Sequence, residues 1–182
     1  MLSRRTLVGS LSAVAFGSAL REAVAAPDQP AISMREHERV MRLAIVEARR
    51  NWAWPFGAVI VRAADGAVMA RGVNNGIGNP ILHGEIAAMN DYVAHHGNKG
   101  WGAMVLYTTG EPCPMCMSAL VWAGIGGVVF GTSIDGLKRA GIDQIEITAK
   151  AVIGASPFYH GTLLGGVLEK ETDQLFLRRK RS

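Results

Sequence analysis

Four side chains that can bind metal ions or move protons occur in two short stretches of the chain. The first stretch, LHGE, contains His83 and Glu85. The second, EPCPMC, contains Cys113 and Cys116, the only two cysteines of the sequence. Imidazole nitrogen and thiolate sulfur are ligands that favour zinc over other divalent metals. These residue types therefore predict a zinc site formed by His83, Cys113 and Cys116.

The number of ligands indicates what such a zinc ion would do. A structural zinc site has four protein ligands, whereas three protein ligands leave one tetrahedral position for water. Glu85 is not needed as a ligand, so its carboxylate is available to move protons during hydrolysis. Each motif stands at the expected start of a helix, and we expect the two helix starts to flank one pocket. The pattern thus predicts a hydrolytic site with Glu85 as its acid and base.

The cysteine pair allows other interpretations. A disulfide between Cys113 and Cys116 would close a very short loop and would constrain little of the unfolded chain. A thioredoxin-like redox pair would open the first helix after an early strand, whereas this pair lies in the middle of the chain. A zinc-binding fold that serves only for interaction would have no use for Glu85 beside the ligands. We therefore favour a catalytic zinc site.

The first 26 residues have the composition of a secretory leader. Arg4 and Arg5 precede an apolar stretch of small residues, and the sequence AVAA ends the segment. The paired arginines resemble the twin-arginine type of signal, which is an address read by a receptor and not an anchor. We expect a signal peptide that is cleaved near Ala25 or Ala26, and one domain over 27–182 in a periplasmic or otherwise exported protein.

Composition argues against several classes of partner. The full chain has a formal net charge of +4, of which the leader carries two charges, so +2 remains in the mature domain. Part of this remainder lies in the terminal RRKRS. A nearly neutral body with a short basic tail offers no electrostatic footprint for nucleic acid. No apolar run reaches the ~20 residues that a membrane span needs. We therefore expect no nucleic-acid partner and no membrane span.

Apolar periodicity and turn residues predict the strands and helices of the domain. A helix begins at Ser33, which forms a capping box with Glu36, and an Asp65-Gly66 turn joins the first two strands into a hairpin. The expected strands are 58–62, 67–73, 104–108, 127–131 and 144–148, and the expected later helices are 82–95, 113–122, 133–140 and 167–177. A hairpin followed by βαβ units predicts an α/β fold, a three-layer α/β/α sandwich on a mixed sheet.

The two metal-binding motifs combine into H-x-E followed by P-C-x-x-C, the signature of zinc-dependent nucleobase deaminases. From about Arg35 onward, the sequence resembles the cytidine deaminase superfamily, in its branch of guanine deaminases and tRNA adenosine deaminases. This resemblance implies a five-stranded mixed sheet covered by helices, one Zn²⁺ per subunit and hydrolytic loss of ammonia. It also implies a homodimer in which the partner helps to close each pocket.

The same resemblance suggests which residues contact the substrate. Asn74, in the GVNN turn, matches the family's base-binding asparagine; the alternatives are Asn75, or a turn asparagine that contacts no ligand. Phe56, in PFGAVIV, is either a contact to a substrate ring or part of the core. Gly84 would direct its backbone N–H at a substrate carbonyl or ring nitrogen. Asp143, in AGIDQ, matches an acidic residue that guanine deaminases present to the base edge, and is either a proton shuttle or a solvated loop residue.

These expectations point to a small ring that carries an amidine group. We expect guanine or guanosine, or a related purine or pterin, as the substrate. Cytosine, cytidine and adenosine are alternatives, because attack at a ring C–NH₂ group is the same chemistry. An exported protein would not meet tRNA, and the small charge of the mature domain agrees with a small-molecule substrate.

Overall fold

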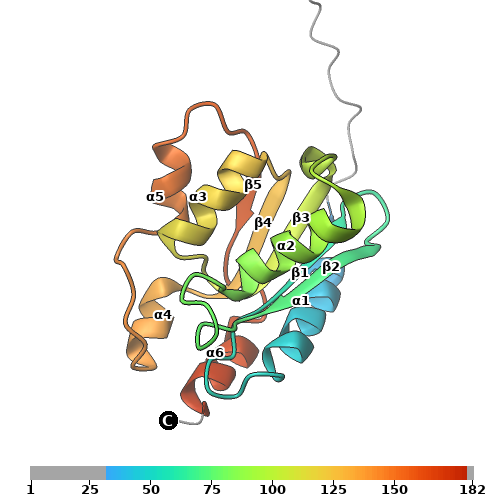
Figure 1. The fold of residues 1–182 in the computed structure, drawn as a ribbon. Helices are drawn as coiled ribbons and strands as arrows, with labels where there is room; N and C mark the ends of the chain where they lie inside the picture. Colours follow the sequence, from blue (N-terminus) through green and yellow to red (C-terminus); the bar gives the residue numbers. More distant parts are fainter. Residues whose placement is uncertain (1–31, 180–182) are drawn as a thin grey trace, which may run out of the picture.

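The structure is a computed structural model that describes residues 32–179 (Figure 1). Its five-stranded sheet has the order β2-β1-β3-β4-β5. The strands are β1 (Gly57–Arg62), β2 (Val68–Val73), β3 (Met104–Gly110), β4 (Gly127–Thr132) and β5 (Thr162–Leu164). The helices are α1 (Met34–Ala48), α2 (Gly84–His96), α3 (Pro114–Ala123), α4 (Ile134–Arg139), α5 (Ala149–Gly154) and α6 (Glu169–Leu177), with a short 3₁₀ helix η1 (Trp101–Ala103).

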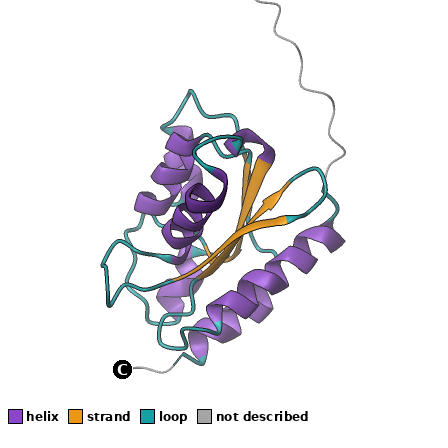
Figure 2. Cartoon of the chain, turned by 45° about the vertical axis from the view of Figure 1, so that its right-hand side comes forward, coloured by secondary structure: helices purple, strands orange, loops and turns teal. Residues whose placement is uncertain are grey.

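The sheet is mixed and has a helix layer on each face (Figure 2). Strand β1 pairs antiparallel with β2 and β3, while β3, β4 and β5 run parallel. Side chains alternate between the two faces of a strand, so Ala58 and Ile60 of β1 join the core beneath α2 and α3. Val59 and Val61 join the core beneath α1 and α6. The predicted three-layer α/β/α sandwich is confirmed.

Local signals in the sequence explain where α1 begins and how α2 reaches the sheet. The Ser33 hydroxyl accepts a hydrogen bond from the Glu36 backbone N–H at 3.3 Å, as one half of the expected capping box. Gly72 of β2 lies directly under α2, and a Cβ there would stand 2.3 Å from the Ala88 nitrogen and from the Gly84 carbonyl oxygen. This close approach is open only to glycine, and it holds the first turn of α2 against the sheet.

The expected strand over 144–148 is wrong. These residues form no strand, and the fifth strand is Thr162–Leu164, which pairs with β4 in the register Val128↔Leu163. Ile145 and Ile147 alternate as a strand would, but both side chains are exposed. The Thr148 hydroxyl accepts from the Ala151 N–H and so begins α5, a helix that the sequence pattern did not predict. The free edge of β4 is instead filled by the later segment.

The membrane-span expectation concerns the described residues, whereas the leader lies before them. Among residues 32–179, no helix is both long and apolar enough to cross a membrane. The expected leader over residues 1–26 lies outside the described residues, as does the end of the basic tail. The leader and the domain boundary at 27 therefore stay predictions.

Candidate active site

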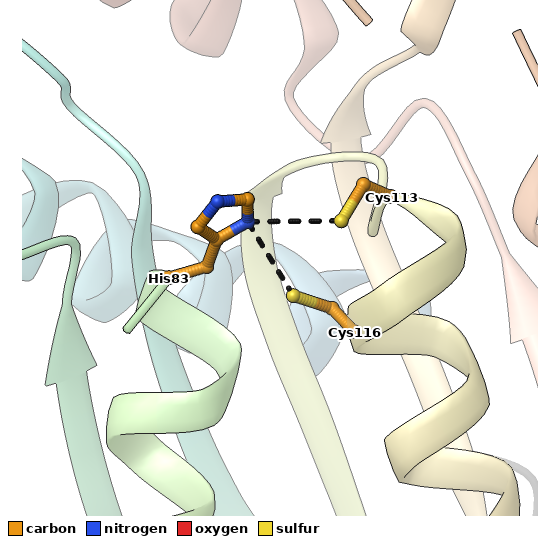
Figure 3. Close-up of side chains that lie close together, drawn as sticks. All are labelled: His83, Cys113 and Cys116. Atoms are coloured by element: carbon orange, nitrogen blue, oxygen red, sulfur yellow. Dashed lines mark hydrogen bonds between the residues drawn. The ribbon is translucent and has the colours of Figure 1, made fainter. Parts of the chain in front are cut away.

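The three expected zinc ligands lie at the starts of two helices. His83 is the N-cap residue of α2 and Cys113 is the N-cap residue of α3, both in extended backbone conformation. Neither side chain caps its own helix, which leaves both free to face each other. Cys116 lies in the first turn of α3 and is fully buried. Figure 3 shows the imidazole directed toward both sulfur atoms.

The distances fit a tetrahedral zinc site. His83 Nδ1 lies 3.6 Å from Cys113 Sγ and 3.6 Å from Cys116 Sγ, and all three ligand atoms lie within 4.8 Å of one another. Bonds of about 2.3 Å to sulfur and about 2.0 Å to nitrogen at tetrahedral angles separate sulfur and nitrogen by about 3.5 Å. The donor atoms and their spacing are therefore those of a zinc site with three protein ligands.

The protons of this cluster are shared among its members. A hydrogen bond from the Cys116 thiol lowers the pKa of Cys113 to about 4. The same bond, together with burial, raises the pKa of Cys116. Contact with the Cys113 sulfur raises the pKa of His83. The protein groups thus already favour one thiolate, and a divalent cation would displace the remaining thiol proton.

Glu85 lies in the first turn of α2, beside this cluster. Its side chain is 3% exposed, and the Thr108 hydroxyl of β3 donates a hydrogen bond to its Oε1 at 3.0 Å. Burial raises the pKa of the Glu85 carboxyl above its ordinary value. A carboxyl group with a raised pKa can both accept and return a proton near neutral pH. The structure therefore places the Glu85 carboxyl group beside the zinc-ligand cluster, and its acid-base role stays a prediction.

A cavity of about 370 Å³ opens in front of these groups. His83, Glu85 and Cys113 line its floor. Its walls come from the segment before β1, the loop between β2 and α2, and the loop between α4 and α5. The cavity lies beyond the carboxyl ends of the parallel strands β3 and β4, where α/β folds commonly bind small molecules.

Asn74 and Asn75 are separated by the structure. Asn74 lines the cavity and is 9% exposed, whereas Asn75 is exposed and does not line it. The backbone of Asn74 is fixed, because its N–H donates to the Phe56 carbonyl and its own carbonyl accepts from the Asn51 side chain. Of the two alternatives, the geometry favours Asn74.

Phe56 and Gly84 meet at the start of β1. Phe56 lines the cavity, and its ring also packs on Phe176 of α6 with centroids 4.9 Å apart, so both of its expected roles are compatible with the structure. Gly84 is buried, and a Cβ there would lie 2.5 Å from the Phe56 carbonyl oxygen. An alanine at Gly84 would push this backbone away from α2. The glycine therefore helps to set the position of the cavity floor.

The opposite wall of the cavity contains Asp143, as expected, and two residues that the sequence did not single out. Ile142 and Gln144 flank it and also line the cavity. Trp54 completes the rim, and the Arg179 guanidinium lies 5.0 Å from the centre of its ring. Loop residues of this kind carry no periodic pattern, which is why sequence reasoning missed Ile142 and Gln144.

Glu111 is a further cavity residue to which the motif analysis gave no role. It directly precedes Pro112-Cys113 in the chain, lines the cavity and is 7% exposed. The signal that was available is a carboxylate next to an apolar strand and a metal motif, since buried carboxylates need hydrogen-bond donors. The donors are contributed by residues distant in the sequence, so the sequence pattern did not reveal them.

Comparison with known proteins agrees with this geometry. Residues 34–132 match the cytidine and deoxycytidylate deaminase zinc-binding region. The chain is 35% identical over 132 residues to a guanine deaminase of Bacillus subtilis, a match that covers 69% of this chain and 83% of the relative. It is 35% identical over 118 residues to a tRNA-specific adenosine deaminase of Streptococcus pyogenes, covering 62% of this chain and 67% of the relative.

A solved structure shares the fold. The guanine deaminase from Nitrosomonas europaea superposes with a TM-score of 0.67 at 24% sequence identity, covering 76% of this chain and 81% of that chain. The zinc-binding match spans more than half of the sequence, from α1 to the end of β4, and it includes every residue of the His83, Glu85, Cys113 and Cys116 cluster. The chain therefore belongs to the cytidine and deoxycytidylate deaminase family, as a zinc-binding deaminase that hydrolyses C–N bonds.

Proposed function

We propose that the protein deaminates a small purine-like base or nucleoside, with guanine or guanosine as the preferred substrate. The environment of the Asn74 side chain is the main support for this proposal. This side chain lines the cavity, is nearly buried and makes no hydrogen bond with any other residue of 32–179. Its N–H donors and its carbonyl acceptor are therefore available to pair with the alternating donors and acceptors of a purine edge. The similarity to the B. subtilis guanine deaminase supports the same substrate class.

The residues of the site suggest how the reaction proceeds. Zn²⁺ held by His83, Cys113 and Cys116 supplies a Lewis acid that lowers the pKa of water to about 7. Glu85 accepts a proton from the attacking water and delivers it to the departing nitrogen. The water oxygen bonds to the ring carbon, the C–N bond to the amino group breaks, and the second water proton moves to the ring nitrogen, which gives ammonia and the oxo compound. Thr108 holds one oxygen of Glu85 and so limits the directions from which the proton is exchanged.

Ammonia release from purified, zinc-loaded protein tests the proposal. The panel contains guanine, guanosine, adenine, adenosine, cytosine, cytidine and pterins, with Glu85→Ala as the control for contaminating activity. We expect turnover of guanine or guanosine that the control lacks. Turnover of cytosine or cytidine alone would contradict the purine assignment, and silence across the panel with zinc present would contradict the substrate class.

Replacing Asn74 with alanine is expected to raise KM for the purine substrate about 10- to 100-fold. The physical reason is that substrate polar groups would lose their partner at a nearly buried position. The neighbouring Asn75→Ala variant is the matched control, because Asn75 is exposed and outside the cavity. Steady-state kinetics of both variants decide the question. Equal KM values for the two would show that Asn74 does not contact the base.

We further propose that residues 1–26 direct export through the twin-arginine route, as their composition suggests. This route carries folded proteins, so zinc can cover Cys113 and Cys116 before they meet an oxidising compartment. Replacing the leader with one for unfolded chains is expected to lower the zinc content and the free thiols of the exported protein. Zinc and thiol assays measure this, and full zinc content after the exchange would contradict the proposal.

We also propose a homodimer, on the basis of the family resemblance. Sedimentation equilibrium of the mature protein at micromolar concentration is expected to give twice the mass of one chain. A single-chain mass across the concentration range would contradict it.

A further inference from the structure

One wall of the cavity is a loop with little support of its own. We call residues 140–148, between α4 and α5, the wall segment. Ile142, Asp143 and Gln144 of this segment line the cavity. Ala140 and Ile142, at its start, pack into a core, whereas Ile145 and Ile147 are 60% and 47% exposed. The position of the rest of the wall segment therefore depends on how the flanking helices α4 and α5 are held.

Glu111 holds the starts of both flanking helices, α4 before the wall segment and α5 after it. Its Oε2 accepts a hydrogen bond from the Ile134 N–H at 2.9 Å, and its Oε1 accepts one from the Ala149 N–H at 2.9 Å. These are the first residues of α4 and α5, whose initial N–H groups have no partner within their own helices. The Ser133 and Thr148 hydroxyls cap other N–H groups of the same two helices. Two side chains therefore accept hydrogen bonds from the first N–H groups of each helix: Glu111 and Ser133 at α4, and Glu111 and Thr148 at α5.

Glu111 is itself fixed to the sheet and to the zinc motif. Its N–H donates to the Thr132 carbonyl at 2.7 Å, next to the Gly110↔Thr132 pair that ends the β3–β4 ladder. Pro112 and then Cys113 follow it directly in the chain. The side chain is 7% exposed, and its two oxygens bind backbone N–H groups rather than a charged partner. A buried carboxylate that accepts two such bonds is held in one position.

We propose that Glu111 is a positioning residue that sets the distance of the wall segment from the zinc ligands and thereby determines substrate affinity. It joins Cys113, at the cavity floor, to the starts of the two helices that flank the wall with Asp143 and Gln144. This inference rests on the proposed function, because the wall matters for catalysis only if the cavity binds the substrate.

Glu111→Gln in the full chain tests the proposal. Glutamine keeps the size of the side chain, but one of the two backbone N–H groups would then face an NH₂ donor. We expect hydrogen exchange of the wall segment to become at least tenfold faster and KM to rise about tenfold. The value of kcat should change less than threefold, and zinc should stay at one per chain. A variant with unchanged exchange in the wall segment would overturn the proposal.

Two further variants separate positioning from a general loss of stability. Val40→Ala removes buried atoms of α1 on the far face of the sheet, and it should lower the melting temperature without changing KM or exchange in the wall segment. Ala149→Pro deletes the N–H that Glu111 Oε1 accepts, at a helix position where proline is favoured, and it places the proline ring in a buried position. It should accelerate exchange of the wall segment as Glu111→Gln does. It also carries the test if Glu111→Gln does not fold.

The outcomes distinguish this inference from the proposed function. If the wild-type protein turns over no substrate of the panel, the exchange data still decide whether Glu111 holds the wall segment. If KM rises equally in Val40→Ala and Glu111→Gln, the effect is one of stability, and the positioning role is wrong.

Discussion

Glu85→Gln is expected to lower kcat for ammonia release by about 10²- to 10⁴-fold while the protein stays folded and zinc-loaded. Glutamine has nearly the same shape and can accept the hydrogen bond that Thr108 now donates to Glu85. It cannot carry a proton from water to the departing nitrogen. The loss should therefore appear in kcat, with little change in KM. Steady-state kinetics and zinc analysis of the same preparation measure both quantities.

The control for this prediction is Thr108→Val, which removes the hydroxyl but leaves the carboxyl group. It should lower kcat by far less than Glu85→Gln, because the proton carrier remains and only its orientation is freer. A Glu85→Gln variant whose kcat lies within threefold of the wild type would assign the proton transfer to another group, with Asp143 on the opposite wall as the first to examine.

Cys116→Ser is expected to abolish both zinc binding and activity. Cys116 is fully buried, and it supplies one of the three ligand atoms that lie within 4.8 Å of each other. A serine oxygen is a poor replacement for thiolate at zinc, and the two remaining ligands do not make a site. A ligand present at 100 times its Kd stabilises by about 2.7 kcal/mol. Its loss should lower the melting temperature by about 5–11 °C.

Zinc analysis and thermal unfolding measure these effects, with Met115→Leu as the matched control. Met115 lies between the two cysteines, and leucine conserves its volume. The control should keep its zinc, its activity and nearly all of its stability. The same fall in melting temperature should follow when a chelator removes zinc from the wild-type protein. Full zinc occupancy in Cys116→Ser would exclude this residue as a ligand.

The zinc cluster could be predicted from the sequence because its geometry is largely local. The spacing of Cys113 and Cys116 places both thiols at the start of one helix, and their shared direction follows from the helical turn alone. His83 lies at the start of a second helix, and it was identified because the motif H-x-E followed by P-C-x-x-C specifies most of its residue types. Its approach to within 3.6 Å of both sulfur atoms agrees with that expectation.

The wrong fifth strand has a different cause. The alternating Ile145 and Ile147 satisfy the local pattern of a strand, but a strand also needs an open sheet edge. The edge of β4 pairs with Thr162–Leu164, a segment of three residues that is too short to carry a periodic signal. Which segment occupies the edge is decided by packing of the whole chain. Local propensity does not contain that information.

The family, the metal chemistry of His83, Cys113 and Cys116, and the three-layer architecture could all be predicted from the sequence, because short-range spacing and periodicity suffice for each of these. The tertiary structure was needed to show that Asn74 and not Asn75 lines the cavity, and that Glu111 joins the starts of α4 and α5. The two hydrogen bonds of Glu111 reach Ile134 and Ala149, which lie 23 and 38 positions away in the sequence. They depend on backbone N–H groups, which every non-proline residue carries, so no residue type marks them in the sequence.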